Sequence, residues 1–122
     1  MDKVIKRIVS SLKRYENVIA VYLFGSKAKG KTTALSDIDI AVFLHPYDEE
    51  TARRVCAYSS PTIHTVVFNE LPPYIKFEIV KTGKPVYVKD KETLEDIILF
   101  TMKEYIDYVP FYERQGLIKV RE

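Results

Sequence analysis

Cysteine is scarce in this chain of 122 residues, which contains only Cys56. One cysteine cannot form a disulfide within the chain, and this favours a reducing, cytoplasmic location. No apolar run approaches the ~20 residues that a membrane-spanning helix requires, so no membrane association is expected. The N-terminal segment carries a charge every few positions and lacks the apolar core of a signal peptide.

The chain also lacks a large excess of positive or negative residues. Lys and Arg total 19 against 17 Asp and Glu, which gives a net charge of +2. This balance does not call for a direct nucleic-acid partner. No internal repeat or low-complexity segment occurs. The length predicts a single domain over residues 1–122, and a hydrophobic content of 47% is enough for a packed core.

The most informative stretch spans residues 18–44. Residues 18–24 form a continuous apolar run, which is the pattern of a strand buried on both faces. Gly25 and Ser26 end that run. The second run, residues 37–44, alternates in the manner of a strand and carries two carboxylates on one face. The stretch therefore predicts two strands joined by a turn and a short basic loop.

Two carboxylates on one face of a strand need a cation, because Asp is a poor strand former and like charges repel. Residues i and i+2 of a strand lie ~6.6 Å apart, so Asp37 and Asp39 can converge on one Mg²⁺ or bracket a pair of metal ions. Mg²⁺ is usually held by one or two carboxylates together with substrate phosphates. Gly25 would let the backbone approach a phosphate, and Ser26 would open a short helix whose free N–H groups favour anions. Together these features indicate a site for a nucleoside triphosphate.

The spacing of Gly25-Ser26, ten residues, then Asp37-Ile38-Asp39 resembles the signature of the DNA polymerase beta superfamily of nucleotidyltransferases. The whole chain, including the segment over residues 69–73, resembles the minimal nucleotidyltransferase (MNT) family. The resemblance implies a nucleotidyltransferase fold and an antitoxin role in HEPN/MNT toxin–antitoxin pairs. It further implies ATP as the donor substrate, Mg²⁺ as cofactor with Mn²⁺ as a possibility, and a tyrosine hydroxyl of a HEPN-family toxin as the acceptor of AMP.

The candidate site follows from this pattern. We expect Asp37 and Asp39 to be catalytic and to hold the metal. The residues expected to bind the nucleotide are Gly25, Ser26, Lys27 and Ser36. For Lys27, a solvated loop position is at least as good an interpretation as a phosphate contact.

The chain departs from the family at one position of the predicted strand over residues 62–68. The family usually has a third carboxylate five residues before the Asn of the 69–73 segment, and this count falls on His64, with Thr65 as the neighbour if the register slips. A neutral imidazole can act as a general base, but it suits Mn²⁺ or Zn²⁺ better than Mg²⁺. Three interpretations remain open: altered catalysis with His64 in the site, a nucleotide-binding but inactive subunit, or a histidine without a role.

The rest of the chain predicts an α/β (α+β) fold, with a small mixed sheet and helices mainly on one face. Helical periodicity predicts helices over residues 2–16, 48–58, 71–81 and 91–108, the last broken or kinked at Val109-Pro110. A fourth, edge strand is predicted over residues 84–89 because of Pro85 and the flanking lysines.

The C-terminal region, residues 90–122, is expected to contact a partner, since tyrosine is enriched at interfaces. The residues expected in that surface are Tyr105, Tyr108, Phe111 and Tyr112. Packing on the sheet is an equally good interpretation of these side chains. A homodimer or a hetero-oligomer is possible on this pattern.

Nucleotidyl transfer is the favoured function. The chain is too short to hold a second domain that would grip a large acceptor, so the acceptor is expected to be held by a partner chain or to be that partner. The alternative is a catalytically weak or inactive subunit that neutralises a HEPN ribonuclease by binding alone, which His64 favours. Transfer to a small molecule is a third possibility, and the lack of an acceptor domain argues against it.

Overall fold

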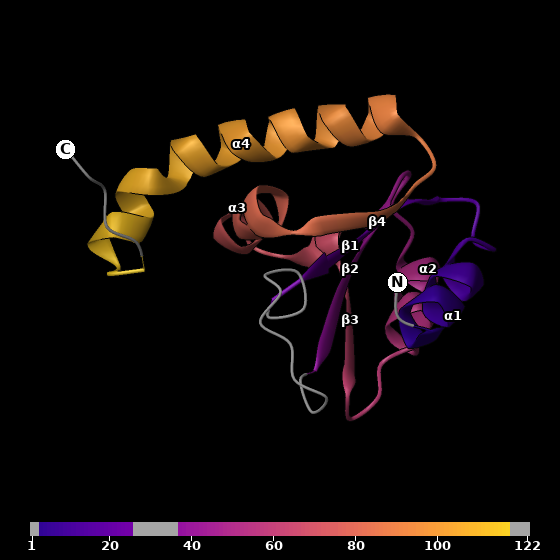
Figure 1. Ribbon diagram of the computed structural model, residues 1–122. Coiled ribbons are helices and arrows are strands. Elements are labelled where there is room, and N and C mark those ends of the chain that lie inside the picture. Colours follow the sequence, from indigo (N-terminus) through magenta and orange to yellow (C-terminus); the bar gives the residue numbers. More distant parts are fainter. Residues whose placement is uncertain (1–2, 26–36, 118–122) are drawn as a thin grey trace.

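The computed structural model describes residues 3–25 and 37–117. In these residues the strands β1 (Val18–Phe24), β2 (Ile38–Leu44), β3 (Ile63–Val67) and β4 (Lys84–Val88) form one sheet in the order β3-β2-β1-β4 (Figure 1). β1 pairs antiparallel with β2 and β4, whereas β2 and β3 run parallel. The sheet is therefore mixed, and β4 lies at its edge, as the sequence predicted.

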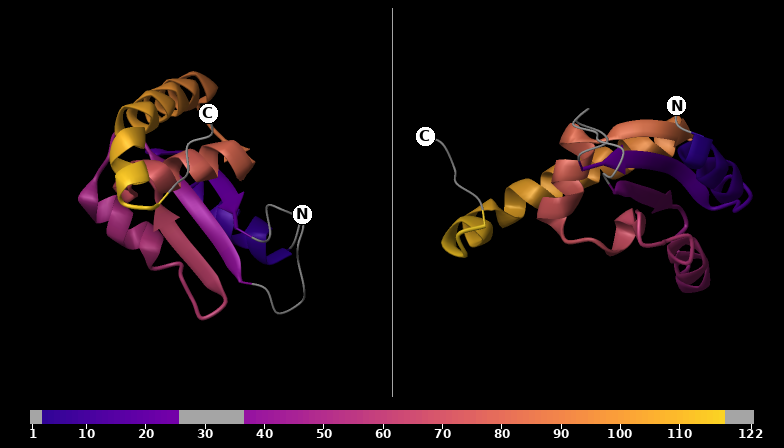
Figure 2. Two further views of the ribbon diagram at one scale, coloured as in Figure 1. Left: turned by 90° about the vertical axis from the view of Figure 1, so that its left-hand side faces the viewer. Right: turned by 60° about the horizontal axis from the view of Figure 1, so that its bottom comes forward.

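Two helices cover each face of the sheet. α1 (Lys3–Leu12) and α2 (Glu49–Cys56) lie on one face, and α3 (Pro73–Thr82) and α4 (Lys91–Arg114) lie on the other (Figures 1 and 2). The α/β class is confirmed. The helices are shared between the faces rather than gathered mainly on one, because β1 is apolar on both sides and each side must be covered.

The face under α1 and α2 holds the larger core. Its buried side chains come from the apolar stripe of α1, from alternate positions of the central strands and from α2; they include Ile8, Leu12, Val21, Ile40, Val42, Leu44 and Val55. Within α1, the apolar residues Ile5, Ile8, Val9 and Leu12 are buried, while Val4 is 41% exposed. The 3.6-residue periodicity of this segment therefore identified the packing face correctly.

The face under α3 and α4 is built on stacked aromatic rings. Phe43 of β2 stacks on Phe68 with centroids 4.0 Å apart, and Tyr22 of β1 lies 4.9 Å from Phe43. Phe43 is 1% exposed. Tyr22 lies on β1 and Phe43 on β2, and the same alternation that directs Phe43 inward also directs Asp39 toward this face.

The segment between β3 and α3 ties the end of β2 in place. It begins with a 3₁₀ turn, η1 (Phe68–Glu70), whose Asn69 side chain bonds to the backbone of Leu44 twice. The Leu44 N–H donates to Asn69 Oδ1 at 3.0 Å, and Asn69 Nδ2 donates to the Leu44 carbonyl at 2.8 Å. The Tyr47 hydroxyl donates to Glu70 Oε2 at 2.5 Å. These bonds give a physical role to the start of the 69–73 segment.

α4 is longer than predicted. The expected end near Tyr108 is wrong, because the helix runs to Arg114 with Pro110 inside it. Its direction changes toward the C-terminal end, where its last turns extend past the sheet (Figure 1). Pro110 removes one helical hydrogen bond and favours a kink, but Tyr112 is 4% exposed and its packing on α3 holds the following turn. Within the described residues, no helix has the length and apolarity to span a membrane.

Candidate functional site

Gly25 and Asp39 meet where β1 ends. Phe24 pairs with Asp39 across the β1–β2 ladder, so the next residue, Gly25, lies beside the Asp39 side chain. Gly25 has φ +73°, and a Cβ at this position would collide with Asp39 Oδ2. The glycine is therefore required twice, once by its left-handed backbone and once by the carboxylate that touches it. The structure thus brings together two of the predicted site residues.

His64 lies next to Asp39 on the other side. The two residues are partners in the parallel β2–β3 ladder, and His64 Nδ1 lies 3.5 Å from Asp39 Oδ1. The His64 side chain is 61% exposed and that of Asp39 is 25% exposed. Thr65 is 4% exposed and belongs to the opposite side of β3, so the register places His64, not Thr65, at the site.

The electrostatics of the site centre on Asp39. Burial raises the pKa of the Asp39 carboxyl, the nearby charge of Asp37 raises it further, and His64 acts in the opposite direction. Asp37 itself is exposed and directly precedes β2, so it is not within the strand as the sequence suggested. A raised pKa means that the surroundings of Asp39 disfavour its charged carboxylate form. A cation bound beside Asp39 would offset this penalty. Three further predicted nucleotide-binding residues, Ser26, Lys27 and Ser36, lie outside the described residues.

The donor set fits Mg²⁺ bound together with a phosphate substrate. In the described part of the chain, no group of three or more His, Cys, Asp or Glu side chains could hold a metal alone. Asp37 and Asp39 supply two carboxylates, which is the usual protein contribution to a Mg²⁺ site completed by substrate phosphates. His64 is a poor ligand for this hard cation.

A cavity of about 250 Å³ opens beside Gly25, in the angle between the end of β1 and α3. It is lined by Phe24, Gly25, Tyr74, Ile75, Glu78, Ile79 and Thr82. The α3 residues recur at the i, i+4 and i+8 positions of one helix face. The sequence did not predict that Tyr74 and Glu78 lie beside Gly25; their helical spacing is visible in the sequence, but nothing there places that face of α3 at the end of β1.

A larger cavity, of about 560 Å³, lies at the opposite end of the sheet. Its lining includes Ile19 near the start of β1 and His45 just beyond β2, whereas Gly25 follows the end of β1. It is therefore remote from the carboxylates, whereas the smaller cavity borders Gly25.

A family described as polymerase beta nucleotidyltransferase matches residues 6–92, which is more than half of the chain. The chain belongs to this nucleotidyltransferase family. The resemblance that the Gly25-Ser26 and Asp37-Ile38-Asp39 spacing indicated is thereby confirmed.

Among its relatives is a Methanocaldococcus jannaschii protein named as a protein adenylyltransferase, 35% identical over 83 residues. That match covers 68% of this chain and 66% of the relative, so the chain spans just under two thirds of the relative's length.

Solved structures share the fold. One chain of a toxin–antitoxin crystal structure with AMP-PNP superposes with a TM-score of 0.69 at 22% identity, covering 89% of this chain and 93% of that chain. A chain from the complex of tri-AMPylated Shewanella oneidensis HEPN toxin with MNT antitoxin superposes with a TM-score of 0.65 at 19% identity, covering 93% and 94%. The nucleotidyltransferase fold expected from the sequence is confirmed.

Proposed function

We propose that this protein is an MNT-type antitoxin that transfers AMP from ATP to a tyrosine hydroxyl of a HEPN-family toxin. The arrangement of Gly25, Asp39 and His64 at one end of the sheet carries the proposal. It is supported by the relative named as a protein adenylyltransferase, by the AMP-PNP structure and by the AMPylated toxin complex that share the fold.

In the proposed reaction the acceptor oxygen attacks the α-phosphorus of ATP, the bond to the bridging oxygen breaks, and pyrophosphate leaves. Gly25 lets the backbone come close to the triphosphate, and Asp39 and Asp37 would hold Mg²⁺. The bound cation would neutralise the charge that develops on the phosphates. His64, exposed and 3.5 Å from Asp39, is placed to accept the proton of the attacking hydroxyl. Because His64 is open to solvent, a macromolecular acceptor can reach it.

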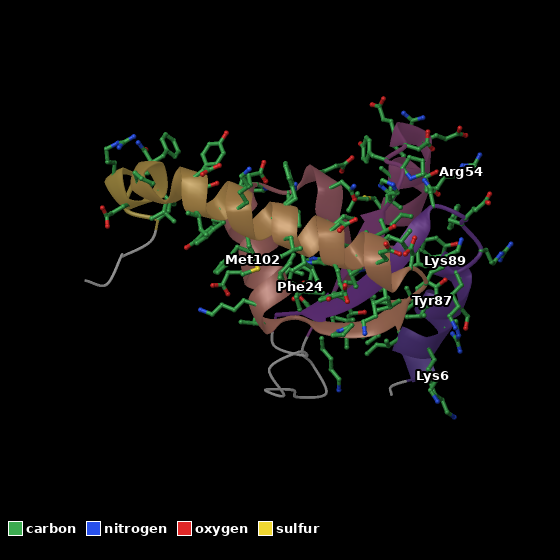
Figure 3. All side chains as sticks on the ribbon, turned by 90° about the horizontal axis from the view of Figure 1, so that it is seen from above. Lys6, Phe24, Arg54, Tyr87, Lys89 and Met102 are labelled. Carbon is green, nitrogen blue, oxygen red and sulfur yellow. The ribbon has the colours of Figure 1, made fainter. Side chains whose placement is uncertain are left out.

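The partner surface in this proposal is the outer face of α4. We define this outer face by its exposed apolar side chains, Leu99, Phe100, Met102, Ile106, Tyr108 and Phe111. Figure 3 looks onto α4 from outside, with Met102 labelled on its flank. Leu99 and Ile106 are each 66% exposed, which is unusual for large aliphatic residues spaced along one helix. We assign this face to the HEPN-type partner, since the complexes that share the fold contain one.

Two residues of the expected partner surface, one half-buried and one buried, pack against α3 instead. Tyr105 stacks on Phe77 with centroids 3.9 Å apart and planes at 6°. Tyr112 is 4% exposed and lies edge-on to Tyr74 at 5.2 Å. Both therefore pack α4 onto α3. Tyr108 and Phe111 remain available, at 47% and 46% exposure.

The test combines purified protein, ATP, Mg²⁺ and the HEPN partner, and measures intact masses. The partner should gain the mass of AMP, and Asp39→Asn should abolish the gain. His64→Ala should slow transfer without weakening ATP binding, while His64→Asp should keep or raise the rate. Equal rates in the wild type and both His64 variants would remove His64 from the mechanism.

The second candidate function is inhibition of the partner by binding alone. It is favoured by one observation: in the described residues, His64 occupies the ladder position beside Asp39 where a third carboxylate would complete the site. Formation of a stable complex with no mass gain under Mg²⁺ or Mn²⁺ would support this function and refute the proposed transfer.

A further inference from the structure

The small net charge of this chain conceals an uneven distribution of its charged side chains. Residues 3–14, which comprise α1 and the turn after it, contain five Lys or Arg residues and no Asp or Glu. α4 is the reverse, with six Asp or Glu residues against three Lys or Arg. Net charge alone therefore gave no reason to expect a nucleic-acid partner, whereas the distribution of charge points to a basic surface on α1.

The five cations form one stripe along the outer side of α1. At 3.6 residues per turn they fall within about one third of the helix circumference, opposite the buried apolar stripe, and extend over about 16 Å. All five are exposed, and among the described residues none of them forms a salt bridge. We call this stripe the basic face of α1; its members are Lys3, Lys6, Arg7, Lys13 and Arg14.

Two tyrosine rings border the C-terminal end of the basic face. An open cavity of about 330 Å³ is lined there by Tyr15, Arg54, Ala57 and Tyr58. A hydrogen bond with Tyr58 and burial raise the pKa of Tyr15, whereas the charges of Arg54 and Arg14 lower it. Both guanidinium groups therefore lie near the two rings.

Two further contacts complete this surface. Lys13 lies over the Tyr87 ring of β4, with its ammonium nitrogen 5.2 Å from the ring centroid. Arg54 pairs with Glu50 at 2.9 Å, so Arg14 is the cation left to meet a phosphate beside the two tyrosines. Figure 3 shows Tyr87 and Arg54 at the same end of the molecule, away from the last turns of α4.

From this arrangement we propose that the basic face of α1 binds single-stranded RNA, with bases stacking on the tyrosines beside Arg14. Cations for the phosphates next to partly exposed aromatic rings are the two features that single-stranded nucleic-acid sites share. An acidic protein would need the cations but not the rings. A membrane surface would need the apolar stripe of α1, which is buried in the core. Loops and ends of RNA present unpaired bases, whereas the bases of duplex DNA are stacked inside the helix.

The proposed RNA surface and the proposed partner surface lie on opposite sides of the sheet. α1 and α2 cover one face of the sheet, and α3 and α4 cover the other (Figure 1). This placement leaves the basic face open while the outer face of α4 holds a partner. RNA binding by this face does not depend on AMP transfer, so either can fail without the other.

The experiment measures binding of the full chain to a fluorescein-labelled single-stranded RNA of about 16 nucleotides by fluorescence anisotropy, at several salt concentrations. Five phosphate contacts predict a slope of about −3.5 for the logarithm of the association constant against the logarithm of salt concentration. The triple variant Lys6→Gln, Lys13→Gln and Arg14→Gln should bind at least about tenfold more weakly and reduce the size of the slope by about 2. Tyr58→Leu should weaken binding about fivefold with the slope unchanged, since it removes stacking but no charge.

The control is the triple variant Lys91→Gln, Lys103→Gln and Arg114→Gln, which removes the same charges from exposed positions of α4. It should bind the RNA as the wild type does, and thermal melts should show both triple variants folded, because all six positions are exposed. Duplex DNA of the same length and poly-L-glutamate should each bind at least about fivefold more weakly than the RNA, since neither offers bases for stacking.

The proposal is overturned if the two triple variants bind the RNA equally or if Tyr58→Leu binds it as the wild type does. Equal affinity for duplex DNA would also overturn it, because the face would then recognise phosphate charge alone. Equal affinity for poly-L-glutamate would assign the face to an acidic protein instead.

Discussion

At the residue scale, replacing Gly25 introduces two effects together, the strain of a left-handed backbone and a steric clash with Asp39. Gly25→Ala would place a Cβ against Asp39 Oδ2 on a backbone with φ +73°. We expect AMP transfer to be lost, because the added Cβ would displace the Asp39 carboxylate. The free energy of unfolding should fall by about 1–2 kcal/mol, the cost of left-handed strain, since the carboxylate can rotate away. Transfer is measured by intact mass and stability by urea denaturation.

Gly116 provides the matched control for this substitution. It has φ +74°, but a Cβ added there meets nothing within 4 Å. Gly116→Ala should therefore show the strain cost alone and retain transfer. If the two alanine variants lose the same stability and both still transfer AMP, the close approach of Gly25 to Asp39 is not needed for transfer.

Asp39 should make stability depend on pH. Burial and the charge of Asp37 raise its pKa in the folded protein, so the folded state binds this proton more tightly than the unfolded chain does. The wild type should thus lose stability as pH rises through the interval from the ordinary carboxyl value to the raised one. Asp39→Asn lacks this loss, so its melting temperature relative to the wild type should rise between about pH 3 and pH 7.

Thermal melts in EDTA across that pH range measure the difference. A difference that stays flat or falls with pH would contradict the raised pKa. Adding Mg²⁺ with ATP at pH 7 should raise the melting temperature of the wild type more than that of Asp39→Asn, because the variant lacks one metal-binding carboxylate.

At the scale of elements, Asn69 holds the last residue of β2 through two hydrogen bonds. Its side chain satisfies both the N–H and the carbonyl of buried Leu44. Asn69→Ala leaves both backbone groups without this partner, and we expect a loss of about 2–3 kcal/mol in the free energy of unfolding. Urea denaturation measures the loss.

Asn17→Ala is the comparison variant, since Asn17 Nδ2 donates to the Pro46 carbonyl at an exposed position near the same strand end. Solvent can replace that bond, so the cost should stay below about 1 kcal/mol. Equal losses of unfolding free energy for the two variants would show that the hydrogen bonds from Asn69 to Leu44 contribute no more stability than the exposed bond from Asn17.

α3 and α4 pack against each other, and α3 lines the cavity beside Gly25. Tyr105 stacks on Phe77 of α3, and Tyr112 supports Tyr74, which lines the cavity beside Gly25. Removing the end of α4 at Val109 would delete buried Tyr112 and disturb both packing and cavity. Point substitutions on the outer face are therefore a cleaner probe of partner binding than truncation.

At the scale of the whole molecule, the outer face of α4 should bind the partner without stabilising the monomer. The double variant Leu99→Ala with Ile106→Ala should weaken the complex at least about tenfold, since each truncation removes apolar contact worth about 1 kcal/mol or more. Its melting temperature should be unchanged or higher, because both residues are 66% exposed and Ala favours helix. Surface plasmon resonance and thermal melts give the two readouts.

Asp107→Ala, an exposed neighbour on the same helix, should leave the affinity intact. Loss of melting temperature in the double variant, with affinity preserved, would mean that these side chains stabilise the fold and do not contact a partner.

Local patterns were sufficient for most elements and for the proximity of Gly25, Asp39 and His64. β1 was predicted at its observed bounds, because a seven-residue apolar run between turn residues has few alternatives. Counting back from Asn69 reached His64, since strand register preserves spacing. The end of α4 was missed, because long-range packing of Tyr112 on α3 outweighs the local effect of Pro110.

The sequence by itself determined which residues come together: a glycine turn, two carboxylates and a histidine at spacings that a strand and a ladder convert into proximity. Tertiary structure alone decided what surrounds these residues. It placed one face of α3 beside Gly25, put His64 and the cavity on opposite sides of Asp39, and left Leu99 and Ile106 uncovered while burying Tyr112. The physical reason is that spacing along a strand is set by covalent geometry, whereas the face a helix presents to a distant strand depends on how the whole core packs.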